Sequence, residues 1–235
     1  MSSVVVPPGM SHCSVPGAAV LDALADALLL SEPERRHLHL IARSESPAPR
    51  HRPAPVSASL RALLAGMPML PAYVVDFRFD VLARNEAAAA LFGAGFGTGT
   101  AANIARLVFL DPATRRTQLD WDRVARETVG NLRANLARHR GDARLGGLVT
   151  ELRDGSAEFG DWWQDHTVQE RNHGRKRIRH PVGGELTVSY DVLATLDDSD
   201  QRLFVLTPAD AASERALRAI IGQHSQRLTR PASVA

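Results

Sequence analysis

The chain has 235 residues, a length that suits one domain of ordinary size with a smaller appendage. Hydrophobic residues make up 44% of it, which excludes a wholly disordered chain, and the formal net charge of +2 is too small to indicate nucleic-acid binding by itself. A single cysteine, Cys13, excludes a disulfide framework and a cysteine metal site.

The N-terminal 17 residues predict a disordered tail. They are rich in Pro, Ser and Gly and lack the basic and then apolar layout of a signal peptide. The most apolar run that follows is interrupted by Asp22 and Asp26, so it is too charged to span a bilayer. These features favour a cytoplasmic protein without a membrane segment.

Two short helices are predicted over 18–43. Apolar residues recur at helical spacing from Ala18, and the run from Ser31 to Glu34 has the form of a capping box with proline in its first turn. Residues 44–56 hold four prolines and few large apolar side chains, which is typical of an extended linker. The main domain is therefore expected over 57–222, with a flexible tail over 223–235.

The main domain is predicted to be α+β. Strands are indicated near 73–75 and 81–83, and helices follow, begun by cap residues such as Asn85, Asn103 and Asp142. Further strands are expected after residue 172, including Leu186–Tyr190 and Leu203–Leu206. This order predicts a PAS-like five-stranded antiparallel sheet with a helical insert, preceded by the two short helices. In such a fold, one face of the sheet curves around a cavity that suits a small ligand.

Residues 162–190 contain two of the three tryptophans, the only lysine and a cluster of arginines. Asn172-His173-Gly174 is predicted to form a hairpin tip, and Pro181 with the glycines after it a second reversal. The cations of 171–179 have three interpretations: a solvated strand edge, a contact to an anionic head group in a pocket, or a phosphate contact. On a strand, Lys176, Ile178 and His180 share the face opposite to that of Arg175, Arg177 and Arg179.

No enzyme motif is found. His166, His173 and His180 lack a partner at metal-ligand spacing, and the alternating glycines of 93–99 lack the context of a phosphate loop, so no catalytic residue, metal or cofactor is expected. That glycine run predicts a flexible loop instead. The tryptophans are either core residues or the lining of a cavity, and Asn85 is either a helix cap or a ligand contact at the cavity mouth.

Four motifs together resemble one family. PAYVVDFRFDVLARNEAAAALFG, LDWDRVARETVGNLR, SAEFGDWWQDHTVQERNHGRKRIRHPVGGELTVSYDVL and DQRLFVLTPA occur in the order typical of the ligand-binding domain of MmyB-like transcription regulators. The resemblance covers about 57–220. One departure is Arg84, which stands where the family commonly has Trp in Leu-Ala-Trp-Asn.

The resemblance implies a pocket for a long-chain fatty acid, such as myristate, or a similar amphiphile. The candidate ligand contacts are Tyr73, Arg84, Asn85, Trp121, Trp163, Arg177, His180 and Tyr190.

It also implies that 18–43 are the last two helices of a helix-turn-helix domain, that the intact relatives bind DNA, and that the protein is a homodimer. The earlier helices of that domain are not found, so DNA binding by this chain itself is not expected. Two alternatives remain: a sensor that pairs with intact relatives, and an enzyme on a PAS-like scaffold.

Overall fold

We analysed a computed structural model that describes residues 17–28, 35, 54–93, 95–164, 172–195 and 200–229. The chain divides into two compact units, Met1–Pro49 and Arg50–Ala235.

The first unit contains one described helix, α1 (Ala18–Ala27), as the spacing of its apolar residues predicts. Leu21 and Ala25 are buried in it. The capping box proposed for the second helix lies outside the described residues. Arg35, from that predicted helix, forms ion pairs with Asp22 at 3.5 Å and with Asp26.

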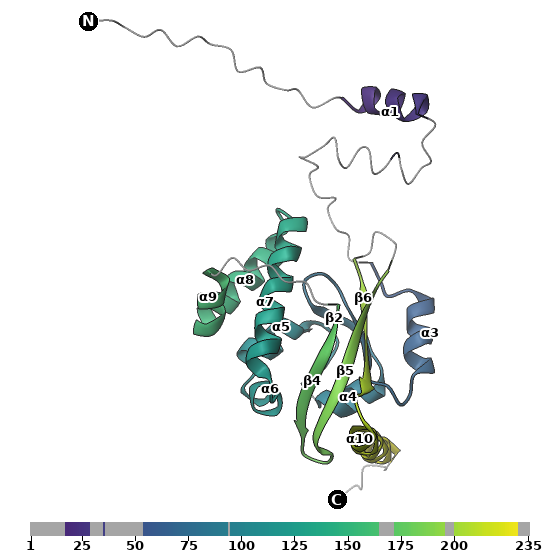
Figure 1. Cartoon of the computed structure of the whole chain (residues 1–235), viewed down its shortest axis with the longest axis vertical. Coiled ribbons are helices and arrows are strands. Elements are labelled where there is room, and N and C mark those ends of the chain that lie inside the picture. The colour runs from purple at the N-terminus through teal and green to yellow at the C-terminus, as the bar shows by residue number, and fades with distance from the viewer. Residues whose placement is uncertain are drawn as a thin grey trace, which may run out of the picture. The chain divides into compact units, whose positions relative to one another are not determined.

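The second unit combines helices with a single antiparallel sheet, which confirms the α+β class (Figure 1). The strands that the structure describes are β1 (Ala72–Val75), β2 (Asp80–Arg84), β3 (Gly99–Asn103), β4 (His173–His180), β5 (Gly184–Ala194) and β6 (Arg202–Pro208). The described helices of this unit are α3 (Ala58–Gly66), α4 (Glu86–Phe92), α5 (Ile104–Leu110), α6 (Pro112–Thr117), α7 (Trp121–Arg138), α8 (Ala143–Gly155), α9 (Ala157–Gln164) and α10 (Ala211–Thr229).

The described sheet has six strands in the order β3-β2-β1-β6-β5-β4, so the prediction of five is wrong. The extra strand, β3, begins at Gly99, the last glycine of the run 93–99 that was expected to be a loop, and continues to Asn103. It pairs with the edge of β2 through Asp80↔Asn103 and Val81↔Gly99, with a bulge between the two pairs. Its sequence, GTAAN, has no alternation of large apolar residues, so only the neighbouring strand edge could reveal it. The likeness to PAS domains stays a prediction.

The predicted hairpin tip at 172–174 is also wrong. His173 and Gly174 already belong to β4, and Gly174 pairs with Tyr190 of β5. A Cβ atom at Gly174 would lie 2.9 Å from the Tyr190 ring, so this glycine is needed for close packing and not for a turn. The reversal predicted at Pro181 is confirmed: it joins β4 to β5, and Gly184 takes a φ of 67° there.

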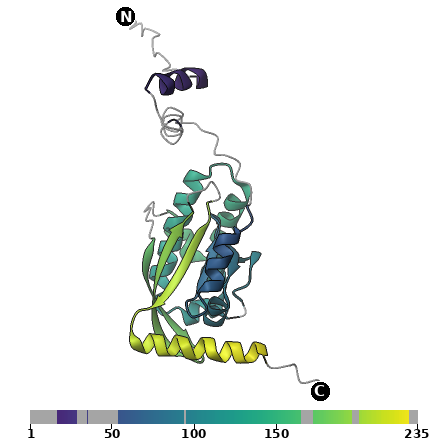
Figure 2. The same cartoon turned by 90° about the vertical axis from the view of Figure 1, so that its right-hand side faces the viewer.

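The helices cover both faces of the sheet. Helices α5 to α9 gather on one side and α3 packs on the other, while α10 runs across one end (Figures 1 and 2). α10 contacts α4, β5 and β6, and its Leu217, Ile220 and Ile221 join the core around Tyr73. α10 was not anticipated, and it stays helical to Thr229, through part of the predicted flexible tail.

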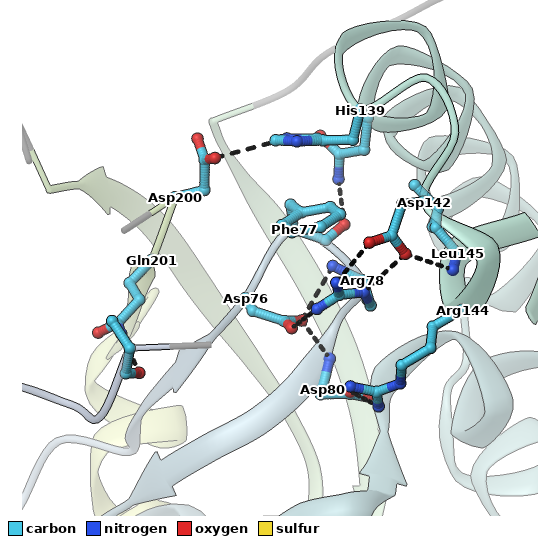
Figure 3. Close-up of polar contacts among 12 residues, drawn as sticks. Asp76, Phe77, Arg78, Asp80, His139, Asp142, Arg144, Leu145, Asp200 and Gln201 are labelled. Carbon is cyan, nitrogen blue, oxygen red and sulfur yellow. Dashed lines mark hydrogen bonds and ion pairs between the residues drawn. The ribbon is translucent and has the colours of Figure 1, made fainter. Parts of the chain in front are cut away.

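A buried ionic network joins the turn between β1 and β2 to the start of α8 (Figure 3). Arg78, which is 5% exposed, donates from Nη1 to Asp76 Oδ2 at 3.2 Å. It also donates from Nε and Nη2 to the two carboxylate oxygens of Asp142, at 2.9 and 2.5 Å. Arg144 bonds to Asp80 at 2.8 Å beside this pair. The network therefore ties the sheet to the helical region.

The carboxyl groups around Arg78 differ in their acidity. Asp142 has its pKa lowered to about 2, chiefly by the hydrogen bonds from Arg78. Asp76 has its pKa raised, first by burial and then by repulsion from Asp80. Asp142 is therefore the main anionic partner of Arg78, since Asp76 must share its site with a second buried carboxylate.

Replacing Arg78 by Met should destabilise this unit strongly. The change leaves two carboxylates with no guanidinium in a poorly hydrated site, so the free energy of unfolding should fall by about 3–5 kcal/mol. Chemical denaturation measures this value. Arg218→Met is the matched control, because the pair of Arg218 with Glu214 is exposed on α10 and its loss should change stability by less than about 1 kcal/mol. Equal effects of the two changes would contradict a central role of Arg78.

The folded protein should lose stability when Asp142 takes up a proton. Because its pKa is lower in the folded chain, its contribution is complete above about pH 4 and disappears as the pH falls toward 2. Asn is also a good helix cap, so Asp142→Asn keeps the cap of α8 and removes the titration. The stability of the variant, followed by denaturation between pH 5 and about 2, should fall less than that of the parent. Asp76, whose raised pKa acts in the opposite direction, is present in both proteins.

Candidate functional site

A cavity of about 470 Å³ lies between the sheet and the helices around it. Its walls come from β1, β4, α4, the loop after α4, α5, α6 and α7, and its lining is mostly apolar. The lining residues are Tyr73, Leu91, Phe92, Gly93, Gly95, Phe96, Ile104, Leu107, Val108, Asp111, Ala113, Thr114, Thr117, Gln118, Val124, Lys176, Ile178, Arg179, His180 and Pro181.

Strand β4 builds one wall mainly from one of its faces, and Arg179 of the opposite face joins the lining near the end of the strand. Lys176, Ile178 and His180 line the cavity, as their shared strand face predicts, and Ile178 is buried opposite Leu186 of β5. Arg177 points away from this wall, and its side chain is 60% exposed, with Glu185 Oε2 at 3.9 Å. Alternation therefore brings the lysine, and not Arg177, to the cavity.

Aromatic rings form a second wall. Tyr73 on β1 contacts Phe96 edge-to-face at 5.0 Å between ring centroids, and Phe92 lies 4.7 Å from Phe96. Phe96 belongs to the loop after α4 and is 3% exposed, so this loop is anchored by its own ring. Gly93 ends α4 with a φ of 81°, which L side chains rarely adopt, and so lets the chain turn back toward the cavity.

Lys176 is the half-buried amine of this apolar cavity and the chain's only lysine. Its Nζ lies 5.0 Å from the centroid of the Tyr190 ring. Among the residues that the structure describes, Lys176 has no hydrogen bond and no ion pair, so its ammonium is a charge without a contacting counter-ion there. Burial lowers the pKa of Lys176 to about 8, against the attraction of Glu127 and Asp120.

The acid nearest in effect, Glu127 of α7, already has partners. Arg123 donates to Glu127 Oε1 at 2.7 Å, and the Tyr190 hydroxyl donates to Glu127 Oε2 at 3.1 Å. Arg123 also bonds Asp120. This network accounts for the buried carboxylate without Lys176 and holds the Tyr190 ring beneath the amine.

The His180 ring is held in one neutral form. Its Nδ1 accepts from the backbone N–H groups of Val182 at 3.2 Å and Gly183 at 3.3 Å. The ring proton must then lie on Nε2, which faces the carbonyl of Ala90 at 3.2 Å. Burial lowers the pKa of His180, so the ring contributes a wall and not a cation.

Asn85 braces the backbone around β1. Its Oδ1 accepts from Ala72 N at 3.1 Å and from Ala88 N at 2.9 Å, so it caps α4 as the sequence predicts. Its Nδ2 donates to the carbonyls of Met67 and Leu70, each at 2.8 Å. The amide is therefore fully engaged by protein groups.

Asn85 and Arg84 belong to a second groove of about 430 Å³ between α3, α4 and α10. The lining residues of this groove are Arg61, Leu64, Ala65, Pro68, Ala83, Arg84, Asn85, Glu86, Ile221 and Ser225. Among the described residues, Arg84 Nε is buried and has no hydrogen-bond partner. Neither residue lines the larger cavity.

The predicted contact residues thus fall into separate places. Tyr73 and His180 line the larger cavity together, and Tyr190 lies next to Lys176. Trp121 and Trp163 pack in the core of the helical region, where Trp121 Nε1 donates to the Val108 carbonyl at 2.7 Å.

Sequence reasoning passed over Lys176 as a contact residue. Two signals pointed to it: it is the only lysine, and it shares a strand face with Ile178 and His180.

An apolar cavity against one face of a sheet is typical of a small-molecule-binding domain. Residues 56–220 match the family model of the MmyB-like transcription regulator ligand binding domain, and the chain belongs to this family. No curated protein matches the chain. None of the helices in the described part of the chain combines the length and the apolar character that a membrane span requires.

Replacing Asn85 by Ala should reveal a structural role. The change removes the α4 cap and leaves buried N–H and carbonyl groups unpaired, so the free energy of unfolding should fall by about 2–4 kcal/mol. Ser57→Ala, which removes an exposed cap of α3, is the comparison and should lose about 1 kcal/mol. A stable N85A protein with reduced ligand affinity would instead favour a ligand contact.

Proposed function

We propose that this domain senses a fatty acid or a similar amphiphile, whose acyl chain enters the larger cavity. The observation that carries this proposal is a mostly apolar cavity of about 470 Å³ lined by Lys176, whose amine forms no hydrogen bond or ion pair with any described residue. The amine holds the carboxylate head group, and Ile104, Leu107 and Phe92 are among the contacts of the acyl chain.

The energies are compatible with useful affinity. About a dozen buried methylenes contribute roughly 10 kcal/mol before losses. Immobilising the ligand and ordering the lining side chains offset a large part of this. The head group then decides orientation: a carboxylate beside Lys176 gains a charge-assisted hydrogen bond and supplies a counter-ion to the amine.

We propose further that ligand controls a DNA-binding function of the regulator, in a homodimer. Support comes from the family, whose matched region is the ligand-binding domain of transcription regulators. Ligand alters output only if it binds one conformation better than another. The loop after α4 is the proposed mobile element. Its Gly93, Gly95 and Phe96 line the cavity, so a bound ligand would contact this loop directly.

The class of ligand can be tested before the ligand itself is identified. Native mass spectrometry of the purified protein, followed by lipid extraction, should detect a co-purified acyl chain. Calorimetric titration with myristate should then show one site per chain. A chain that carries no lipid and binds no myristate would contradict the proposal.

Replacing Lys176 by Met should weaken binding and stabilise the empty protein. Loss of a charged hydrogen bond should reduce myristate affinity about 10- to 100-fold. The pKa of Lys176 is lowered in the folded chain, so below the ordinary pKa of lysine its charge disfavours folding, and its removal should raise the melting temperature. Lys176→Arg keeps the charge and should retain most of the affinity. Unchanged affinity in K176M would place the head group elsewhere.

A further inference from the structure

The chemistry of Lys176 extends beyond that of a fixed positive charge. An amine that is half-buried in an apolar cavity, without a hydrogen bond or ion pair to any described residue, has an accessible lone pair once it loses a proton. Desolvation in an apolar pocket is one of the ways in which proteins activate lysine as a nucleophile.

Charged and polar groups on several elements around Lys176 influence whether its amine is protonated. Glu127 of α7 and Asp120, the residue just before this helix, favour the ammonium, while Arg123 of α7 opposes it. Tyr190 of β5 lies under the amine, and its hydroxyl is committed to Glu127.

From the rest of the cavity lining, Asp111 is held by the N-terminal amides of α6, and Arg179 forms an ion pair with Glu185. His180, also in the lining, is held by backbone groups. The resulting pKa of about 8 leaves roughly a tenth of the amine neutral at pH 7, several hundred times more than for an ordinary lysine.

We propose that Lys176 captures long-chain aldehydes in this cavity as imines, so that the domain recognises acyl aldehydes covalently as well as carboxylates by charge. This inference rests on the proposed binding of an acyl chain in the same cavity. The cavity supplies the chain contacts, and the lysine supplies the reacting atom.

The reaction is balanced without an oxidant or a reductant. The neutral amine of Lys176 attacks the aldehyde carbon, and a C–N bond forms as the carbonyl oxygen takes up a proton. The resulting carbinolamine loses its oxygen as water, and the second proton of the nitrogen returns to the solvent. The product is an imine and one water, and hydrolysis reverses the step.

The apolar walls favour long aldehydes over short ones. Each methylene that leaves water for the cavity should raise occupancy about fourfold, so a long aldehyde reaches the amine at a far lower concentration than a short one. The Tyr190 ring beneath the amine can face a protonated imine as it faces the ammonium, so charge near Glu127 is kept when the adduct gains a proton.

Reductive trapping tests this directly, because the chain has one lysine and the N-terminal amine is its only other primary amine. The purified protein is incubated with tetradecanal and sodium cyanoborohydride, and the alkylated peptide is located by mass spectrometry. We expect labelling of Lys176 at least tenfold above that of the N-terminal amine. We also expect tetradecanal to react at least tenfold faster than propanal. Equal labelling of the two amines, or equal rates for the two aldehydes, would overturn the proposal.

Two variants separate the amine from the cavity. Lys176→Arg removes the nucleophile and keeps the charge, so it should abolish the adduct while a folded circular dichroism spectrum persists. Leu107→Trp fills the cavity wall and leaves Lys176 in place. It should slow labelling by tetradecanal at least tenfold while labelling by propanal stays unchanged. An L107W protein that reacts with tetradecanal as fast as the parent would show that the cavity does not guide the reaction.

Myristate binding, measured in parallel, distinguishes the two proposals. Binding of myristate without trapping of tetradecanal rejects imine formation and leaves the fatty-acid site intact. Trapping that myristate suppresses supports both. Trapping of tetradecanal by a protein that does not bind myristate supports the imine and rejects the carboxylate as the head group.

Discussion

The position of one buried guanidinium governs this domain. Arg78 stands at the turn between β1 and β2 and meets Asp142 at the start of α8, 64 residues later. Because a carboxylate and a guanidinium are stable in a protein interior only when they face each other, this contact fixes the helical region against the sheet. The cavity lies between α5, α6 and α7 on one side and β4 on the other. It therefore depends on the spacing between the helical region and the sheet, which the contact of Arg78 with Asp142 helps to fix.

The charge of Lys176 at the cavity, in contrast to that of Arg78, has no ionic partner in the part of the chain that the structure describes. Arg78 and Glu127 have ionic partners, but Lys176 has no hydrogen bond or ion pair among the described residues, and the apolar cavity that it lines is not filled by neighbouring side chains. Both features lower the stability of the empty protein. A ligand with an acyl chain and an anionic or carbonyl head group would remove both penalties at once, which is how binding energy could be transmitted to the rest of the regulator.

Local signals in the sequence identified much of the scaffold. Asn85, Asn103 and Asp142 cap helices as expected, and α7 (Trp121–Arg138) follows its apolar spacing. The misassigned elements were those with weak local patterns. β3 has no large alternating side chains, and Gly174 resembles a turn glycine although it makes room for the Tyr190 ring. In the site, Tyr73 and His180 were brought together, whereas Arg84 and Asn85 lie at a different groove.

By itself the sequence determined most of the helices, most strands, the family resemblance and the face of β4 that Lys176 shares with Ile178. Those features follow from periodicity and capping, which act over a few neighbouring residues. Only the tertiary structure decided which face of β4 turns inward, that Arg78 pairs with Asp142, and that the one lysine meets no counter-ion within the described part of the chain. Such facts depend on strand order and on contacts between distant segments, which local spacing does not encode.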